Sequence, residues 1–304
     1  MPHYTLTDGE TLKNKLGAHS HNELEAREVD FVQAREAEHT LQQIIERTFD
    51  AGHLKAIHRH LFQDVYEWAG RTRDEKVRLS DGTIATEPLL YRPGGKPFLV
   101  GAQIREGLDQ IGDTLRNADY LRGLPRSEFA FRAASILARI NTIHPFREGN
   151  GRTQRLFLRE LAAEAGHTLD FRVVSREGMI QASIAAHEND DIRSMHRMLD
   201  EISNPNRIAA LSTAIAFLAG MNFPWNDQYL ATMEAGHAAE VTIAGISGQH
   251  FMARTGSAIL IGQRSDLPDA NITSGQRTRI FPSQWPEPGE LPAQSSRRSP
   301  STGP

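Results

Sequence analysis

Cysteine is absent from this 304-residue sequence, which excludes disulfide bonds, thiolate metal sites and a cysteine nucleophile. That absence suits a reducing cytosol. Long apolar runs are missing too: the longest, residues 208–218, is short and interrupted, so no membrane-spanning helix is predicted. The N-terminus lacks the basic and apolar regions of a signal peptide, and we expect no secretory leader.

Lysine is scarce, because only 5 of the 34 basic residues are lysines, a bias that we attribute to coding preference. The net charge of −4 gives no global electrostatic reason to expect a nucleic-acid partner. Apolar residues make up 39% and charged residues 24%, as in soluble globular proteins. The length predicts one domain of about 200 residues with an appendage, or two domains.

One stretch, residues 144–155, combines residue types that suit a bound nucleotide triphosphate. His144 is of the type that titrates near neutral pH and can take a proton from an attacking hydroxyl. Glu148 can hold Mg²⁺ through a carboxylate oxygen. The Gly-Asn-Gly run at 149–151 lets the backbone approach phosphates, with N–H groups pointing at them.

The residues after this run predict a helix over 151–165, whose N-terminus favours anions. Arg152 and Arg155 are three residues apart and therefore share one helix face, from which both can reach outer phosphates. Taken singly, each residue has a simpler explanation. A lone histidine is usually buried in the core, two helix arginines usually face solvent, and Phe146 is expected to be core. The combination favours a functional site.

The stretch matches the pattern H-x-F-x-[DE]-G-N-G-R-x-x-R at every defined position. It resembles the Fic family of nucleotidyltransferases, most of which transfer AMP from ATP to a protein hydroxyl. A second segment, residues 57–73, also resembles the family's segment before its flap, and His58 within it is expected to be a core residue.

The resemblance covers about residues 22–202 and implies a mostly α fold, a Fic-type helical bundle with a β-hairpin flap at about 76–100. Periodicity independently predicts a series of helices in this region and just beyond it. We expect them at 23–48, 54–66, 103–117, 127–143, 151–165, 179–189, 192–202 and 205–220, with a short extended segment at 169–174.

In the family, the flap edge pairs with an extended segment of a target protein, which positions a peptide without demanding its sequence. The resemblance places this docking edge at Val77, Arg78, Leu79, Lys96, Pro97 and Phe98. The flap is longer than a minimal hairpin needs. Its extra length either selects targets or is a tolerated surface loop, and the sequence does not decide between them.

Outside the Fic-like region we expect less order. Residues 1–21 are predicted to be a flexible N-terminus, in which His19 and His21 have metal-ligand spacing but no third ligand, so a solvated loop is favoured. Residues 203–263 are predicted to form a helix and a small β module, similar to the OB-like module after the Fic domain in Bartonella effector proteins. We favour scaffolding over nucleic-acid binding for it. Residues 264–304 are predicted to be a disordered tail.

The resemblance implies a mechanism in which a target hydroxyl attacks the α-phosphorus of ATP and His144 removes its proton. Glu148 holds Mg²⁺, which bridges the α- and β-phosphates. The N–H groups of residues 149–151, helped by the Asn150 side chain, form an anion hole. Arg152 grips the β-phosphate, with the γ-phosphate left open as a second contact, and Arg155 binds the γ-phosphate. Residues near Met179, Ser183 and Asn189 are candidates for the adenine pocket by analogy.

Many family members carry an inhibitory helix with the pattern [ST]-x-x-x-E-[GN], whose Glu pairs with the second motif arginine. This sequence has no match, since the nearest, Thr83-x-x-x-Glu87, is followed by Pro88. The resemblance therefore implies silencing by a separate small antitoxin, or no silencing of this kind. Of the other family chemistries, AMP removal relies on that Glu, and Doc-like phosphoryl transfer departs from glycine at position 151.

Three hypotheses remain open from the sequence. We favour an AMP-transferring toxin or effector, acting in the bacterial cytoplasm or translocated into a recipient or host cell. The second is a Fic-fold enzyme that moves another nucleotide or phosphate-containing group. The third is a non-catalytic interaction module on a Fic scaffold, against which the intact motif argues.

Overall fold

The computed structural model describes residues 4–92, 94–269 and 271–289. The chain forms two compact units, each described by itself below: residues 1–169 with 182–196, and residues 170–181 with 197–304. The division between the units crosses two helices: α6 (Arg176–Asn189) begins in the second unit, and α7 (Arg193–Ile202) ends there.

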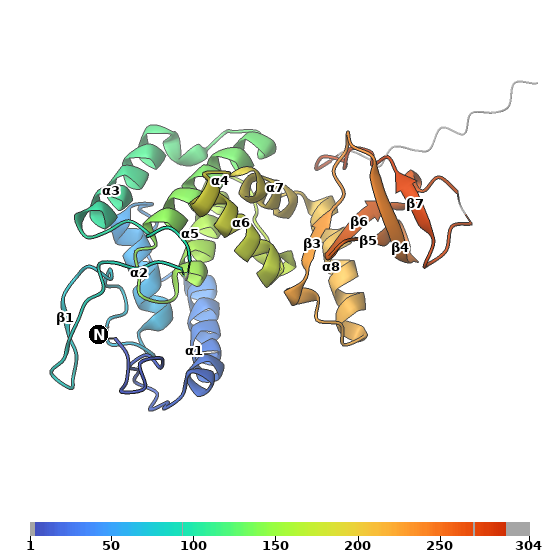
Figure 1. The fold of residues 1–304 in the computed structure, drawn as a ribbon. Coiled ribbons are helices and arrows are strands. Elements are labelled where there is room, and N and C mark those ends of the chain that lie inside the picture. Colours follow the sequence, from blue (N-terminus) through green and yellow to red (C-terminus); the bar gives the residue numbers. More distant parts are fainter. Residues whose placement is uncertain (1–3, 93, 270, 290–304) are drawn as a thin grey trace, which may run out of the picture. The chain divides into compact units, whose positions relative to one another are not determined.

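The first unit is a helical bundle around α4 (Figure 1). Its helices are α1 (His21–Gln42), α2 (Ala51–Phe62), α3 (Ala102–Asn117), α4 (Arg126–Ile143) and α5 (Asn150–Glu164). α4 is made of good helix formers and buries apolar side chains on most of its circumference, because α3 and α5 both pack on it. Its buried residues include Phe129, Ala133, Leu137 and Ile140.

α1 ends earlier than the predicted Thr48. Its N-terminus is capped by Ser20, whose side chain accepts from the N–H of Glu23, and it ends where Gln43 adopts a left-handed conformation. Three apolar residues within the predicted range 23–48 are exposed: Phe31, Leu41 and Ile44. The buried face instead carries two polar residues as well as two apolar ones: Leu24, Glu28, Val32 and His39.

Residues 4–20 are packed, contrary to the flexible stretch predicted at 1–21, of which residues 1–3 lie outside the described residues. Tyr4 is only 1% exposed and stacks edge-on against Trp68, with ring centroids 5.3 Å apart. Thr5 forms an isolated antiparallel bridge with Leu12. An aromatic core contact and a backbone bridge therefore hold a segment whose composition is mostly polar.

The flap consists of two short hairpins. In the first, β1 (Val77–Arg78) pairs antiparallel with β2 (Ile84–Ala85). In the second, Tyr91 bridges Pro97, and the N–H of Phe98 donates to the carbonyl of Leu90 at 2.9 Å.

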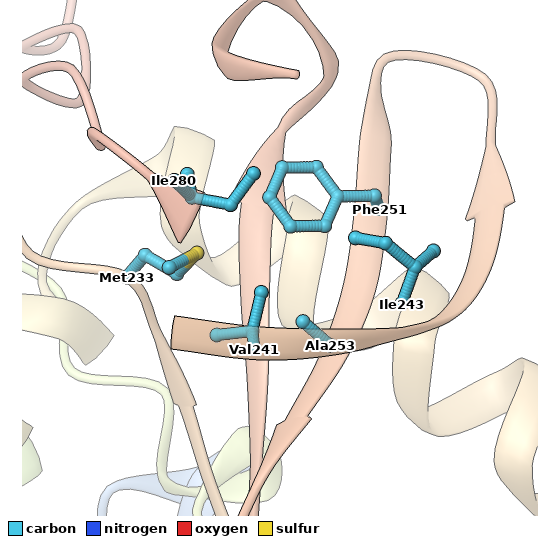
Figure 2. Close-up of a cluster of buried hydrophobic side chains, with 6 residues drawn as sticks. All are labelled: Met233, Val241, Ile243, Phe251, Ala253 and Ile280. Atoms are coloured by element: carbon cyan, nitrogen blue, oxygen red, sulfur yellow. The ribbon is translucent and has the colours of Figure 1, made fainter. Parts of the chain in front are cut away.

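The second unit contains α8 (Pro205–Gly220), capped by Asn204, and a five-stranded sheet in the order β3-β6-β5-β4-β7. β3 runs parallel to β6, and the other pairs are antiparallel. Figure 2 shows the side chains that fill the space inside this curved sheet: Met233, Val241, Ile243, Phe251, Ala253 and Ile280. The strands are β3 (Tyr229–Thr232), β4 (Ala239–Ser247), β5 (His250–Thr255), β6 (Ala258–Gln263) and β7 (Arg277–Ile280).

Our predictions for this unit were partly wrong. Residues 171–173 form a 3-10 turn where an extended segment was expected, and β3 was missed. The predicted tail contributes β7, and Trp285 within it is 3% exposed and donates to the carbonyl of Met233 at 2.9 Å. The rest of that prediction, residues 290–304, lies outside the described residues. Within the described part of the chain, every helix is too short or too polar to cross a membrane.

Candidate active site

The loop between α4 and α5 is held in shape by its own side chains. His144 ends α4 in a left-handed conformation, with φ 45° and ψ 61°, because the following Pro145 opposes continuation of the helix. The side chain of Asn150 then spans the loop, accepting from the N–H of Phe146 at 3.0 Å and donating to its carbonyl at 2.8 Å. Both polar atoms of the Asn150 side chain are thereby engaged in shaping the loop.

Gly149 is the position in this loop that requires glycine. Its φ is 83°, and a Cβ there would overlap the ring of Phe62. Gly149 caps α5, so the N–H groups of the next three residues, 150–152, have no acceptor inside the helix. Together with the helix dipole they make the loop a place where an anion is stabilised.

His144 is partly buried, and its Nδ1 atom is fully buried. Burial lowers its pKa to about 3, and the positive charge of Arg73 acts in the same direction, so the ring is neutral at pH 7. The main chain of Asn141 raises the pKa and so acts in the opposite direction. Nδ1 is buried and has no hydrogen-bond partner among the described residues. That leaves Nε2 as the nitrogen able to meet a substrate proton. The ring of Phe98, from the flap, stacks on the imidazole with centroids 4.0 Å apart and an interplanar angle of 12°.

Arg152 already has a partner in this structure. Its guanidinium pairs with the buried carboxylate of Glu28 on α1 and lies 3.6 Å from the carboxylate of Glu148. It also lies over the ring of Phe62, with the guanidinium carbon Cζ 4.8 Å from the ring centroid. Glu28 also accepts from the hydroxyl of Tyr66. The two carboxylates therefore orient Arg152 and partly neutralise its charge before any phosphate binds.

Arg155 is different, because its guanidinium makes no hydrogen bond or ion pair with any residue that the structure describes. Burial lowers its pKa, and the neighbouring charge of Arg152 adds to the effect. The charge of Glu36 acts in the opposite direction. Arg155 lies beside Gly151, with Nη1 3.7 Å from the place where a Cβ would be. A largely buried cation without a hydrogen-bonded or ion-paired partner costs free energy that a bound anion would recover.

Glu148 has the features of a residue that could hold Mg²⁺. Its side chain is 45% exposed, and one carboxylate oxygen accepts from the N–H of Gly149 at 2.9 Å, which leaves the other free for an ion. Across the described ranges there is no cluster of three or more acidic or histidine ligands. Such an ion would therefore be completed by water and by ligand oxygens.

His58 holds this loop from beneath. Its Nδ1 accepts from the N–H of Gly70 at 2.7 Å, so Nε2 carries the proton and donates to the carbonyl of Glu148 at 3.0 Å. Burial lowers the pKa of His58 to about 3, which keeps it neutral. It is the core residue that we predicted, and it also sets the position of the loop.

Residues 48–162 match the model of the Fic/DOC family. A protein adenylyltransferase of Bartonella henselae is 36% identical over 271 residues, which are 89% of this chain and 50% of the relative. The structure of the type IV secretion system effector protein BepA is 32% identical, with a TM-score of 0.88, and covers 94% of this chain and 98% of that one. A BepC structure from Bartonella tribocorum with bound AMPPNP is 36% identical, with a TM-score of 0.64, over 66% of this chain and 96% of that one.

The chain belongs to the Fic/DOC family. It spans about half the length of the Bartonella henselae relative. The Fic motif residues His144 to Arg155 all fall on the α4–α5 loop and the first turns of α5, as the sequence predicted.

The Fic flap residues divide into two groups. The side chains of Leu79 and Phe98 are buried, so they contribute to the interior and not to a docking edge. Arg78, Lys96 and Pro97 are exposed and Val77 is partly so. Of the adenine-pocket candidates, Met179 belongs to the second unit, whereas Ser183 and Asn189 belong to the first.

Four residues around the Fic site were not assigned to it from the sequence: Glu28, Arg73, His187 and Glu188. Arg73 is fully buried and donates from its guanidinium to main-chain carbonyls on both the motif side and the flap side. His187 and Glu188, at the end of α6, contact the flap. Arg73 lies within residues 57–73, whose resemblance to the family's segment before the flap could have indicated a role at the site. The other three sit on helices of ordinary composition, where a polar residue predicts a solvent-facing position.

Proposed function

We propose that this chain is a protein adenylyltransferase that transfers AMP from ATP to a hydroxyl side chain of a target protein. The observation that carries the proposal is the unpaired guanidinium of Arg155 in the second turn of α5, on the helix that follows the motif loop, with a neutral His144 where that loop begins. The guanidinium of Arg155 can bind an anion, and the neutral ring of His144 can accept a proton. The names of the relatives support the same activity.

In the proposed reaction, the target hydroxyl oxygen attacks the α-phosphorus of ATP and its proton passes to Nε2 of His144. The bond from the α-phosphorus to the bridging oxygen breaks, and pyrophosphate leaves with that electron pair. Glu148 is the residue that would hold Mg²⁺, which when bound would neutralise charge on the leaving diphosphate. Arg152 and Arg155 bind the β- and γ-phosphates, and the N–H groups of residues 150–152 stabilise the developing charge.

The test is transfer of label to proteins of a target lysate from ATP labelled at the α- or at the γ-phosphate. We expect α-label and no γ-label on the target, and no transfer by His144→Ala, whose ATP binding should stay near that of the wild type because the base acts on the nucleophile. Transfer of γ-label would contradict AMP transfer and support the second hypothesis, a Fic enzyme that moves another phosphate-containing group. Wild-type transfer by His144→Ala would remove His144 from the mechanism.

A second part of the proposal concerns the partners. The target segment pairs with the flap, whose exposed residues include Arg78, Lys96 and Pro97. A small antitoxin with the pattern [ST]-x-x-x-E-[GN] would silence the enzyme by placing its Glu on the free guanidinium of Arg155. The chain would act as a toxin or effector, in the bacterial cytoplasm or in a cell that receives it.

Expression in a bacterial host tests this control. The chain alone should arrest growth, and co-expression of such a small protein should restore it only while its motif Glu is intact. Purified protein that stays inactive until an internal segment is deleted would refute external silencing, because it would reveal an inhibitor inside the chain.

A further inference from the structure

Phe98 of the flap lies between two histidine rings. On one face it stacks on His144, and on the other it stacks on His187 of α6, with centroids 4.5 Å apart and an interplanar angle of 29°. Phe98 and His187 are each 5% exposed, so the side of the stack that covers the proposed base is shielded from water. Any displacement of the flap changes what covers one face of the His144 imidazole.

Two consecutive residues of α6 hold the flap next to this stack. His187 donates from Nε2 to the carbonyl of Lys96 at 3.1 Å, and the N–H of Lys96 donates to the carboxylate of Glu188, at 3.0 and 3.2 Å to its two oxygens. Both main-chain groups of Lys96 are therefore bound by side chains of one helix end. A hydrogen bond to a charged acceptor is the stronger kind, so Glu188 supplies much of this hold.

The turn of the flap is shaped to accept Glu188. At Gly95 a Cβ would overlap the Oε1 atom of Glu188, so the carboxylate lies directly against the backbone of the turn. The N–H of Gly95 donates to the carbonyl of Arg92 at 2.9 Å, which closes the turn. Glycine at 95 and glutamate at 188 fit each other, and a larger residue at 95 would push the flap away.

His187 serves stacking and hydrogen bonding at once, and one of its atoms has no partner. Because Nε2 donates to Lys96, a neutral ring has its bare nitrogen at Nδ1, which is buried without a hydrogen bond to any described residue. A leucine or phenylalanine would fill the space without that cost. The histidine is therefore better explained by its hold on Lys96 than by packing alone.

We propose that His187 and Glu188 are positioning residues of the transfer reaction, which hold residues 96–98 so that Phe98 covers His144 and keeps its ring dry and fixed. The expected effect on the rate of transfer rests on the proposed function. The expected effect on the position of Phe98 over His144 does not depend on it. The charged and titratable groups that face His144 are Arg73 from the segment after α2, Arg92 from the flap and His187 from α6.

The first test measures the protonation of His144 and needs no activity. The NMR signal of its ring, assigned by its loss in His144→Ala, is followed against pH in wild type, His187→Ala and Gln181→Ala, an exposed position on the same helix. In wild type the ring should stay neutral at pH 5, because burial holds its pKa at about 3. In His187→Ala, Phe98 should lift and His144 should titrate at a pH closer to the ordinary value of about 6.5. An unchanged titration would overturn the proposal.

The second test separates positioning from general destabilisation. For label transfer, His187→Ala should lower kcat about tenfold or more at pH 6 and less at pH 8, with KM for ATP within about twofold of wild type. His187→Gln, which keeps a donor for Lys96, should recover part of the rate, and Glu188→Gln should lose less than Glu188→Ala. A uniform loss at every pH with no recovery by His187→Gln would show a merely structural role. Absence of transfer by the wild type would refute the proposed function and leave the NMR test intact.

Discussion

The guanidinium of Arg73 donates from Nε to the main-chain carbonyl of His144 at 2.8 Å. Its other nitrogens donate to the carbonyls of Pro88 and Leu99 at the two ends of the flap's second hairpin. One buried side chain thus joins the proposed base to the flap that covers it. Burial lowers its pKa to about 10, so it remains charged at pH 7.

Replacing Arg73 by lysine should therefore be costly although the charge is kept. A lysine ammonium has three donors in a different geometry and leaves several buried carbonyls unpaired. We expect a loss of about 3–5 kcal/mol in the free energy of unfolding, measured by urea denaturation. Arg71→Lys, at an exposed position two residues away, is the control and should change it by less than about 0.5 kcal/mol. Equal effects of the two substitutions would show that the hydrogen bonds from Arg73 to the flap carbonyls are not important for stability.

Arg155→Ala should weaken the binding of ATP more than that of ADP, because the lost contact is a charge-assisted pair with the γ-phosphate. A difference of about tenfold or more in the ratio of dissociation constants is expected by calorimetry. The matched control is Arg159→Ala, one turn further along α5, where the guanidinium is already paired with Glu36. If ATP and ADP lose equal affinity, Arg155 does not bind the γ-phosphate.

Stability should fall as the pH is lowered from 6.5 toward 4, through His58 and His144. Both have a pKa lowered to about 3 in the folded chain, whereas in the unfolded chain they titrate near 6.5. Below pH 6.5 the unfolded state therefore binds more protons, and each histidine contributes up to about 1.4 kcal/mol per pH unit. Urea denaturation at several pH values measures the slope, which should be smaller in His144→Ala. A slope that this substitution leaves unchanged would contradict the buried, neutral state of His144.

Glu28→Gln should destabilise the fold, because the buried carboxylate binds both Arg152 and the hydroxyl of Tyr66. The expected loss is about 2–4 kcal/mol in the free energy of unfolding, since Arg152 would be left without its buried partner. The same substitution should tighten ATP binding, because the carboxylate no longer competes with phosphate for Arg152. Glu25→Gln, exposed on the same helix, is the control for both measurements. Weaker ATP binding in Glu28→Gln would show that Glu28 chiefly orients Arg152.

The sequence predicted the motif loop and most helices closely, because those features are local. Pro145 and Gly149 act on their own backbone, and α3, α4 and α8 have clear starts and stops within about one residue of the prediction. The predicted C-terminal end of α1 was wrong because residues far along the chain determine which face of this helix is buried. Glu28 meets Arg152, and His39 meets Glu160 at 2.5 Å, so hydrophobic periodicity was misleading there.

The same reason explains the errors at both ends of the chain. Tyr4 is buried because Trp68 lies against it, and Trp285 because the carbonyl of Met233 accepts its indole N–H. Neither pairing leaves a trace in the composition of the surrounding residues, which are mostly polar. Contacts between distant residues of this kind become visible only in a three-dimensional structure.

The contribution of β7 to the sheet determines where this chain can be shortened. A truncation at residue 264, which composition alone would recommend, removes the strand that pairs with β4 along Ala239 to Thr242. β4 would then present unpaired N–H and C=O groups. It would also carry Val241 and Ile243, whose side chains are buried in the hydrophobic cluster of the intact chain. Such an edge is a template for pairing with a second molecule, so the trimmed protein would be prone to aggregate. The safe limit for trimming lies beyond Pro286, whose carbonyl accepts from Asn204 and Asn206 at the start of α8.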